Sequence, residues 1–254
     1  MWPIKEHQID RLFSTALLLT FAGGFADAYT YLNFGFFATA QTGNVILLSL
    51  DLANGNFSGL RFKLLPLLAY TVGIFIVKYL DRRLLPMLKQ YWRLLVLLIE
   101  IIALVWLANM PAYEDPNSLK ITVALTMSFV AALQTTSFNR FGESTYSSMM
   151  TTGNLTSLNQ NFAQYLFTKD KQALKRAFQY GTIVIAFALG AVVGGFTSTR
   201  YQQMAILFVV IIVGLVVLRL GVSLLLFRFN LIDYRGINKL LQRKLKAKEK
   251  ELDD

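Results

Sequence analysis

Two copies of one short polar motif interrupt apolar stretches of this chain, at Thr42-Gly43-Asn44 and at Thr152-Gly153-Asn154. Glycine breaks a helix and exposes backbone groups, while threonine and asparagine supply side-chain donors and acceptors. Such groups at membrane depth need protein or cavity water as partners. We predict that both motifs, with Gln41, bind a substrate or an ion. A second interpretation stays open: each motif is a helix N-cap just outside the bilayer, since threonine and asparagine are good capping residues.

A carboxylate lies inside the first apolar run. Asp27 is about fifteen residues into it, or ~22 Å along a helix. An unpaired carboxylate costs ~2.5 to 3.5 kcal/mol at the centre of a membrane helix, and intramembrane acids are by default functional. We predict a proton- or cation-binding role for Asp27. Its counterpart in the second copy is Ser137, just after Gln134, and we include both in the site. The alternative is that Asp27 caps a helix break, or bonds neighbouring threonine and tyrosine side chains, near the outer interface.

A second pair of charged residues lies within apolar runs, at Glu100 and Arg219. Each is ~12 to 14 Å from the inner end of its helix, so their depths nearly match. Isolated charges in lipid are costly and a pair offsets much of that cost. We therefore predict a structural ion pair between these two helices.

The composition excludes several function classes. Of the 254 residues, 55% are hydrophobic and only 16% are charged, whereas soluble domains carry about a quarter. There is no cysteine and one histidine, and no Gly-x-Ser-x-Gly or His-Glu-x-x-His motif. We expect no enzyme activity, no cofactor and no metal site. The net charge of +10 is concentrated beside apolar segments, which favours a membrane protein over a nucleic-acid partner.

Six apolar runs are long enough to cross a ~30 Å hydrocarbon core as helices. They are Leu12–Leu32, Leu64–Leu80, Trp92–Asn109, Ile121–Phe138, Ala177–Phe196 and Met204–Phe227. Two further segments, Phe36–Ala53 and Ser147–Phe167, are interrupted or too polar to face lipid unaided. The fold class predicted is an all-α, polytopic membrane protein, with interrupted segments after helices one and four.

Lysine and arginine set the orientation of these helices. The loops after the second and fourth helices, and both ends of the chain, are rich in them, while the outer loops hold only Arg61, Lys63, Lys120 and Arg200. By the positive-inside rule, both termini are cytoplasmic. We expect localisation in a bacterial plasma (inner) membrane.

The two motifs also mark an internal repeat. After each motif comes a similar run, Ala69 to Gly73 in the first copy and Ala186 to Gly190 in the second. We predict a single transmembrane domain over 1–230, built from repeats of about 11–110 and 120–229. Because each repeat holds three crossings, the second must be inverted, an arrangement common in transporters. The basic tail, 231–254, is expected to be an amphipathic helix on the membrane surface, a solvated helix or a disordered end.

The run from Phe21 to Ala28, followed by Phe34-Gly35 and Thr42-Gly43-Asn44, resembles the signature of the YoaK-like family. That is a group of bacterial inner-membrane proteins catalogued as a domain of unknown function. The resemblance covers nearly the whole chain. It implies a multi-pass helical membrane protein and supplies no established activity.

Two functions follow from these patterns. The inverted repeat, the paired interruptions and Asp27 favour a transporter or channel for a small solute or ion. The alternative is a structural or regulatory membrane protein that acts through its basic tail or the Gly190-x-x-x-Gly194 step. The partners expected are the lipid bilayer and a small-molecule or ion substrate, with no nucleic acid; a homo-oligomer stays open.

Overall fold

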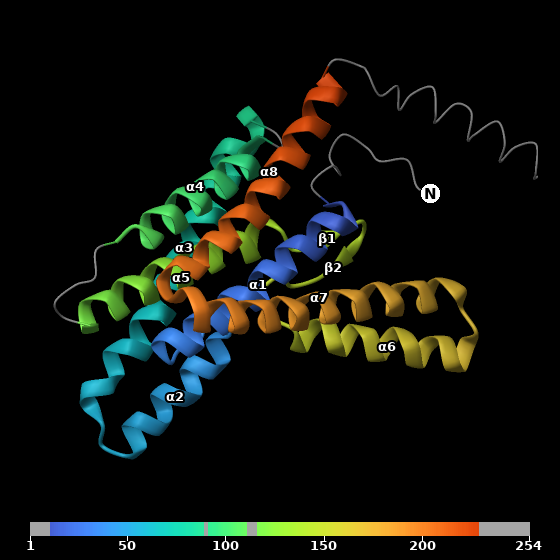
Figure 1. The fold of residues 1–254 in the computed structure, drawn as a ribbon. Helices are drawn as coiled ribbons and strands as arrows, with labels where there is room; N and C mark the ends of the chain where they lie inside the picture. The colour runs from blue at the N-terminus through green and yellow to red at the C-terminus, as the bar shows by residue number, and fades with distance from the viewer. Residues whose placement is uncertain (1–10, 89–90, 111–115, 229–254) are drawn as a thin grey trace, which may run out of the picture.

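The computed structural model describes residues 11–88, 91–110 and 116–228, and the predicted tail lies outside them. The chain is almost entirely helical (Figure 1). The elements in chain order are α1 (Phe13–Phe34), α2 (Gln41–Ala53), η2 (Phe57–Gly59), α3 (Leu60–Leu88), α4 (Tyr91–Ala108), α5 (Pro116–Ser137), β1 (Arg140–Phe141), β2 (Ser144–Thr145), α6 (Thr152–Thr168), α7 (Lys171–Tyr201), η3 (Gln202–Ala205) and α8 (Ile206–Arg228).

The six predicted apolar helices correspond to α1, α3, α4, α5, α7 and α8. The two interrupted segments fold as a linker followed by a helix, α2 or α6, and each of these helices starts at its Thr-Gly-Asn motif. The antiparallel pair β1–β2 between α5 and α6 was not expected. Its strands have two residues each, too short to leave an alternating pattern in the sequence.

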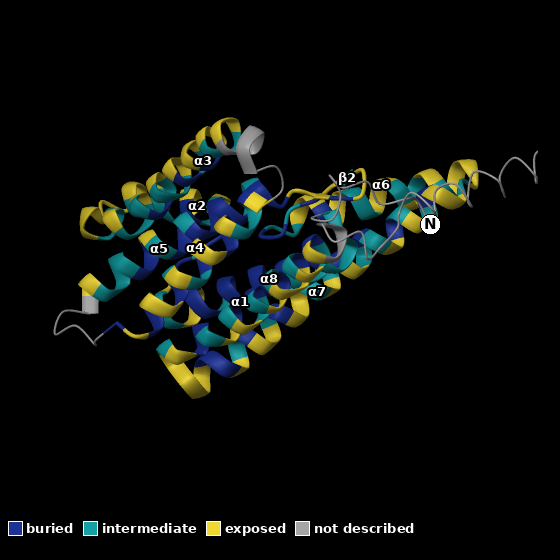
Figure 2. Cartoon of the chain, turned by 90° about the horizontal axis from the view of Figure 1, so that it is seen from above, coloured by how far each residue is buried: buried dark blue, intermediate teal, exposed yellow. Residues whose placement is uncertain are grey.

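Exposed positions run along the outer helices (Figure 2), and large apolar residues occupy many of them. Phe75 on α3 and Phe196 on α7 are 72% and 69% exposed, and many other large apolar residues share their helices. Among the described residues, four stretches are long and apolar enough to cross a membrane: Phe57–Arg83, Tyr91–Ala108, Asn117–Ser137 and Lys171–Leu225. Soluble proteins rarely expose such surface, so the chain is an all-α membrane protein.

The helix α1 lies in the interior, and its closest partner is α7. A Cβ added at Gly24 would collide with the carbonyl oxygen of Phe187, and one added at Gly190 with that of Phe21. Only glycine lets the two backbones approach this closely. Gly194 likewise packs against Phe25 of α1. The Gly-x-x-x-Gly step is therefore used within the chain, between α7 and α1.

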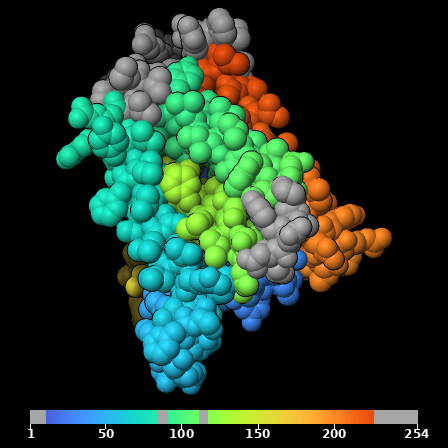
Figure 3. Space-filling view, turned by 90° about the vertical axis from the view of Figure 1, so that its left-hand side faces the viewer, coloured from blue at the N-terminus to red at the C-terminus, as the bar shows by residue number. Residues whose placement is uncertain are grey.

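The other long contacts join α3 to α5 and α4 to α8. The middle of the face in Figure 3 is formed by α2, α3, α4 and α5, and the orange and red atoms of the later helices lie along its right-hand side. The main apolar core lies between α1, α4, α5 and α8, and its largest side chains include Phe25, Tyr29, Leu97 and Leu104.

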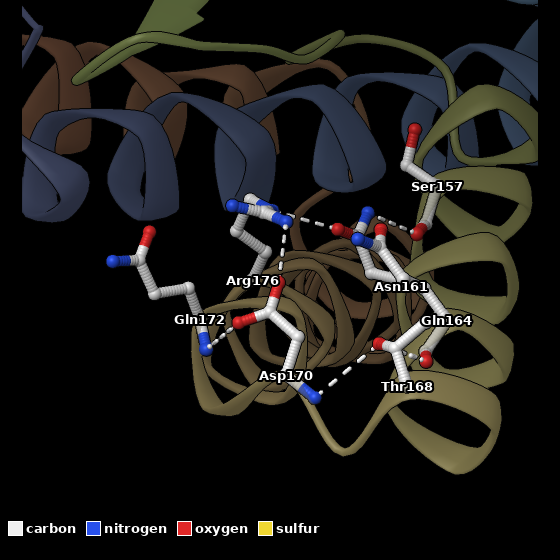
Figure 4. A network of polar contacts seen from close by, with 7 residues as sticks. All are labelled: Ser157, Asn161, Gln164, Thr168, Asp170, Gln172 and Arg176. Atoms are coloured by element: carbon white, nitrogen blue, oxygen red, sulfur yellow. Dashed lines mark hydrogen bonds and ion pairs between the residues drawn. The ribbon is translucent and has the colours of Figure 1, made fainter.

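Two hairpins, α2–α3 and α6–α7, extend from the central helices in different directions (Figure 1). Polar side chains close the α6–α7 turn (Figure 4). Asp170 caps α7 by accepting a 2.8 Å hydrogen bond from the N–H of Gln172, and Arg176 Nε donates to Asn161 Oδ1 at 2.8 Å. At the α2–α3 turn, Lys63 Nζ lies 2.6 Å from Asp51 Oδ2. Both turns are thus fixed by contacts between their own two helices.

Candidate functional site

A cavity of about 630 Å³ opens where α2 and α6 begin. Its wall includes Asp27 from α1, Thr42 from the first motif, and Thr152 and Gly153 from the second. The linkers ahead of the two helices complete it, with Phe187 and Ala191 of α7. Segments more than a hundred residues apart in the chain thus line one space. Four of the predicted site residues lie on its wall.

The two asparagines of the motifs do not line this cavity, because their side chains hold the linkers in shape. Asn44 Nδ2 donates to the carbonyl of Phe37 at 2.8 Å, and Asn44 Oδ1 accepts from the N–H of the same residue at 3.4 Å. Asn154 does the same to Ser147, at 2.7 and 3.1 Å. Each amide therefore closes a loop onto the residue seven positions earlier. Both asparagines are buried and structural in this geometry.

Gln41 and Gly43 support the first of these loops. Gln41 Nε2 donates to the carbonyl of Ala38 at 2.9 Å, and its Oε1 accepts from Asn44 Nδ2 at 3.1 Å. A Cβ added at Gly43 would lie 3.0 Å from the ring of Phe37, so glycine leaves room for that ring. Neither residue is on the cavity wall.

Asp27 is only 6% exposed, and its carboxyl group lies at the amino end of α2. Its Oδ1 accepts a hydrogen bond from the N–H of Thr39 at 2.9 Å, and its Oδ2 lies 2.5 Å from Thr39 Oγ1. The same hydroxyl oxygen lies 2.5 Å from the carbonyl oxygen of Met149. The hydroxyl group of Thr39 thereby connects this carboxyl group to the second linker.

Gln134 and Ser137 on α5 are buried away from the large cavity. Gln134 Nε2 donates to the carbonyl of Leu19 at 3.1 Å and to Ser148 Oγ at 3.0 Å. Its Oε1, like Ser137 Oγ, has no hydrogen-bond partner within the described part of the chain. Ser137 thus occupies the place corresponding to Asp27 without forming a corresponding carboxyl site.

The predicted pair of Glu100 and Arg219 does not form. Glu100 is 1% exposed and its Oε2 has no hydrogen-bond partner among the described residues, whereas Arg219 is exposed on the surface of α8. The two residues match in depth, but each further position on a helix rotates a side chain by about 100°. The depth of a residue in the membrane therefore does not determine which face of its helix it occupies. Glu100 lies on a buried face of α4 and Arg219 on an exposed face of α8.

Glu100 lines a second, inner cavity of about 10 Å³. Thr39, Gln134 and Met149 share its wall with apolar residues of α1, α4, α5 and α8. The pair Asp27–Thr39 therefore separates the two cavities, with Asp27 on the outer one and Thr39 on the inner one.

Thr39 and Met149 were missed at the sequence level. The repeat offered a signal that could have found them. The two residues are 110 positions apart, and each lies three residues before the threonine of its motif. Equivalent positions of a repeat were therefore candidates for mutual contact.

The sequence profile of a family described as "Protein of unknown function (DUF1275)" matches residues 15–219. The chain belongs to this family. The matched part of this DUF1275 protein runs from α1 into α8 and contains Asp27, both motifs and Glu100. The YoaK-like resemblance is consistent with that membership. No curated protein and no solved structure matches the chain at a significant level.

Proposed function

We propose that this DUF1275 protein is a transporter or channel for a small solute or ion in the bacterial inner membrane, not an enzyme. One observation carries the proposal: a buried acid and both Thr-Gly-Asn motifs contribute to the wall of a single cavity. Its volume of about 630 Å³ falls within the usual ~300 to 1,000 Å³ of small-molecule sites. Most of the wall is apolar and a few polar groups converge on it, as expected of such a site.

An inverted repeat is part of the proposal, with α1–α4 as one half and α5–α8 as the other. The packing supports it, because α1 lies on α7 as α5 lies on α3, while α4 and α8 lie on each other. The start of α1 adjoins the end of α5, since the N–H of Gly142 donates to the carbonyl of Arg11 at 2.8 Å. These helices thus run in opposite directions (Figure 1). Contact between the equivalent residues Thr39 and Met149 is expected near a two-fold axis.

Six crossings are also proposed. The stretches over α3, α4 and α5 supply three, and Lys171–Leu225 contains both α7 and α8. The sixth is α1, which has 22 residues and is shielded by its neighbours, so it tolerates Asp27 and several threonines. With both termini cytoplasmic, α2 leads outward and α6 inward from a shared centre. Interrupted helices that meet at the midplane are the usual place of a transporter site.

The flux itself is the first test. Purified protein is reconstituted into liposomes, and uptake is screened with a panel of small organic anions, cations, neutral solutes and inorganic ions. The chain has no cysteine, so a single cysteine at Thr152 places a thiol reagent in the cavity. We expect that label to block whichever flux is found. Thr156→Cys is the matched control, because Thr156 is exposed one turn further along α6.

The topology is tested separately, with single cysteines at the two hairpin tips. Phe57 and Phe167 are 71% and 87% exposed, one at each tip. A membrane-impermeant thiol reagent added to intact cells should label Phe57→Cys and spare Phe167→Cys. Equal labelling of both tips would contradict the inverted repeat. A labelled cavity that leaves every flux unchanged would favour the structural or regulatory alternative.

A further inference from the structure

We infer that Glu100 is a second proton-binding site and that Thr39, with one water molecule, relays protons between it and Asp27. The inference rests on the proposed function for one point, namely that solvent and substrate reach the outer cavity.

Thr39 has one hydroxyl hydrogen and two oxygen neighbours. Its single hydroxyl hydrogen faces two oxygens, Asp27 Oδ2 and the carbonyl oxygen of Met149, each 2.5 Å from Oγ1. A carbonyl oxygen only accepts, so the hydroxyl hydrogen must go to Met149 if that contact is a hydrogen bond. The contact with Asp27 then needs a hydrogen from the carboxyl group. The geometry fits an Asp27 that carries a proton and donates it to Thr39.

The inner cavity has space and hydrogen-bond partners for one water molecule. Glu100 Oε2 and Gln134 Oε1 line or border it, both residues are at most 1% exposed, and neither atom has a hydrogen-bond partner among the described residues. The amide nitrogen of Gln134 donates to Leu19 and to Ser148, and its amide oxygen, which can only accept, is left for another donor. The large majority of buried polar side-chain atoms in proteins have a hydrogen-bond partner, either protein or water. A cavity of about 10 Å³ is close to the minimum for one water molecule, which has two hydrogens to donate.

The two cavities are joined through the contact between Asp27 and Thr39. Thr39 lies on the wall of the inner cavity and Asp27 on that of the outer one, and their side chains touch. Thr39 Oγ1 turns its own hydrogen from the carbonyl oxygen of Met149 to the water in the inner cavity, donates it there, and accepts the proton that leaves Asp27 Oδ2. That water passes one of its hydrogens to the carboxylate of Glu100. The result is an Asp27 carboxylate and a protonated Glu100, with Thr39 and the water unchanged in composition.

Among the described residues, Asp27 and Glu100 are the only carboxyl groups on the two cavity walls. Besides Asp27 and Glu100, Tyr31 is the one titratable side chain on the two walls, which hold no lysine, arginine or histidine. The charged groups on α4 and on the helices packed against α1 and α4 line neither cavity. These are Arg61, Lys63, Lys78, Asp81, Arg82, Arg83, Arg93, Lys120, Lys171, Lys175, Arg176, Arg200 and Arg219.

The relay also has a mechanical consequence. When Asp27 loses its proton, its carboxylate attracts the hydroxyl hydrogen of Thr39, and the bond from Thr39 to Met149 is lost. That bond joins the linker before α2 to the linker before α6. Proton release from Asp27 therefore loosens the two halves at the cavity.

Infrared difference spectroscopy of the reconstituted protein tests the inference without any transport substrate. A change of pH within the range where exposed carboxyl groups stay ionised should produce two protonated-carboxyl signals, one absent in Asp27→Asn and the other in Glu100→Gln. After a rapid pH change, the Glu100 signal should respond more slowly in Thr39→Val, by on the order of a hundredfold, the low end of what a positioned proton donor contributes. Thr39→Ser, which keeps the hydroxyl, should respond as the unmodified protein does.

Thr20→Val is the control, because the Thr20 hydroxyl is buried and bonds only the carbonyl of Ala16 in its own helix. It should leave the Glu100 rate unchanged. The inference is overturned if Glu100→Gln removes no signal, or if Thr39→Val and Thr20→Val respond alike. Either result leaves the flux measurements, and with them the proposed function, unaffected.

Discussion

The linker before α2 and the linker before α6 share one scaffold and differ in chemistry. In both, an asparagine amide closes onto the backbone seven residues earlier, at Phe37 in the first half and Ser147 in the second. Only the first linker meets a carboxyl group, because Asp27 and Thr39 correspond to Ser137 and Met149. The repeated Thr-Gly-Asn motif is thus the part that builds the loops. The ionisable chemistry lies where the halves depart from each other.

The largest expected difference between the halves is at the two helix crossings. A Cβ added at Gly190 on α7 would lie 2.0 Å from the carbonyl oxygen of Phe21, whereas one added at Gly73 on α3 would lie 2.7 Å from the Cβ of Ala132 and 3.2 Å from the ring and the carbonyl oxygen of Phe129. The overlap is deeper at Gly190, so Gly190→Ala should destabilise the protein by about 3 kcal/mol or more. Gly73→Ala should cost about half of that or less by the same reasoning. Thermal unfolding in detergent compares the two, and equal losses would contradict the close α1–α7 crossing.

The next largest effect tests the shared scaffold. Asn44→Ala and Asn154→Ala each leave a backbone N–H and a carbonyl without their partner, at Phe37 or at Ser147. Each substitution should cost about 2 to 4 kcal/mol, since an unsatisfied buried group costs ~1 to 3. The exposed Asn159 on α6 gives the control, Asn159→Ala, with a change within ~0.5 kcal/mol. A loss of flux at normal stability would instead show that the asparagines bind substrate.

A smaller change in stability, with a clear change in function, is expected where the halves differ. Asp27→Asn keeps an oxygen for the N–H of Thr39 and supplies an N–H in place of the acid proton. We expect stability within ~1 kcal/mol of the unmodified protein and a flux that no longer depends on pH. Ser137→Ala should leave the pH dependence unchanged, because Ser137 lies on neither cavity wall. A pH-dependent flux in Asp27→Asn would exclude Asp27 as the coupling group.

Much of the architecture could be predicted from the sequence, because apolar runs of about 20 residues are strong signals for membrane helices. The two polar motifs were also visible, although Gly43 and Gly153 lie in the first turns of α2 and α6 and the breaks expected at these glycines fall in the linkers before them. What could not be predicted depends on rotation and tertiary contact. The depth of Glu100 and Arg219 gave no information on their faces, so their pairing was wrong. The contact between Thr39 and Met149 joins segments that only the folded chain brings together.

The smallest expected effect concerns the ion pairs at the two hairpin tips. Asp51 and Lys63 are 2.6 Å apart at the first tip, while Asp170 and Arg176 are 3.7 Å apart at the second. The hydrogen bond from Lys63 holds the pKa of Asp51 below its ordinary value. A lowered pKa in the folded state means that the pair stabilises the protein above the ordinary pKa of aspartate and loses this effect as the pH falls through the folded value.

Lys63→Met should therefore lower the melting temperature slightly at neutral pH and leave it unchanged in acid. Added salt should reduce the difference at neutral pH as well, since exposed pairs are screened. Arg176→Met provides the comparison, because Arg176 is held mainly by its 2.8 Å bond to the neutral amide of Asn161. Its loss should depend less on pH and salt than that of Lys63→Met. Equal responses of the two variants to pH and salt would contradict this comparison. The two tips would then be held by the same kind of contact, although their ion-pair distances differ.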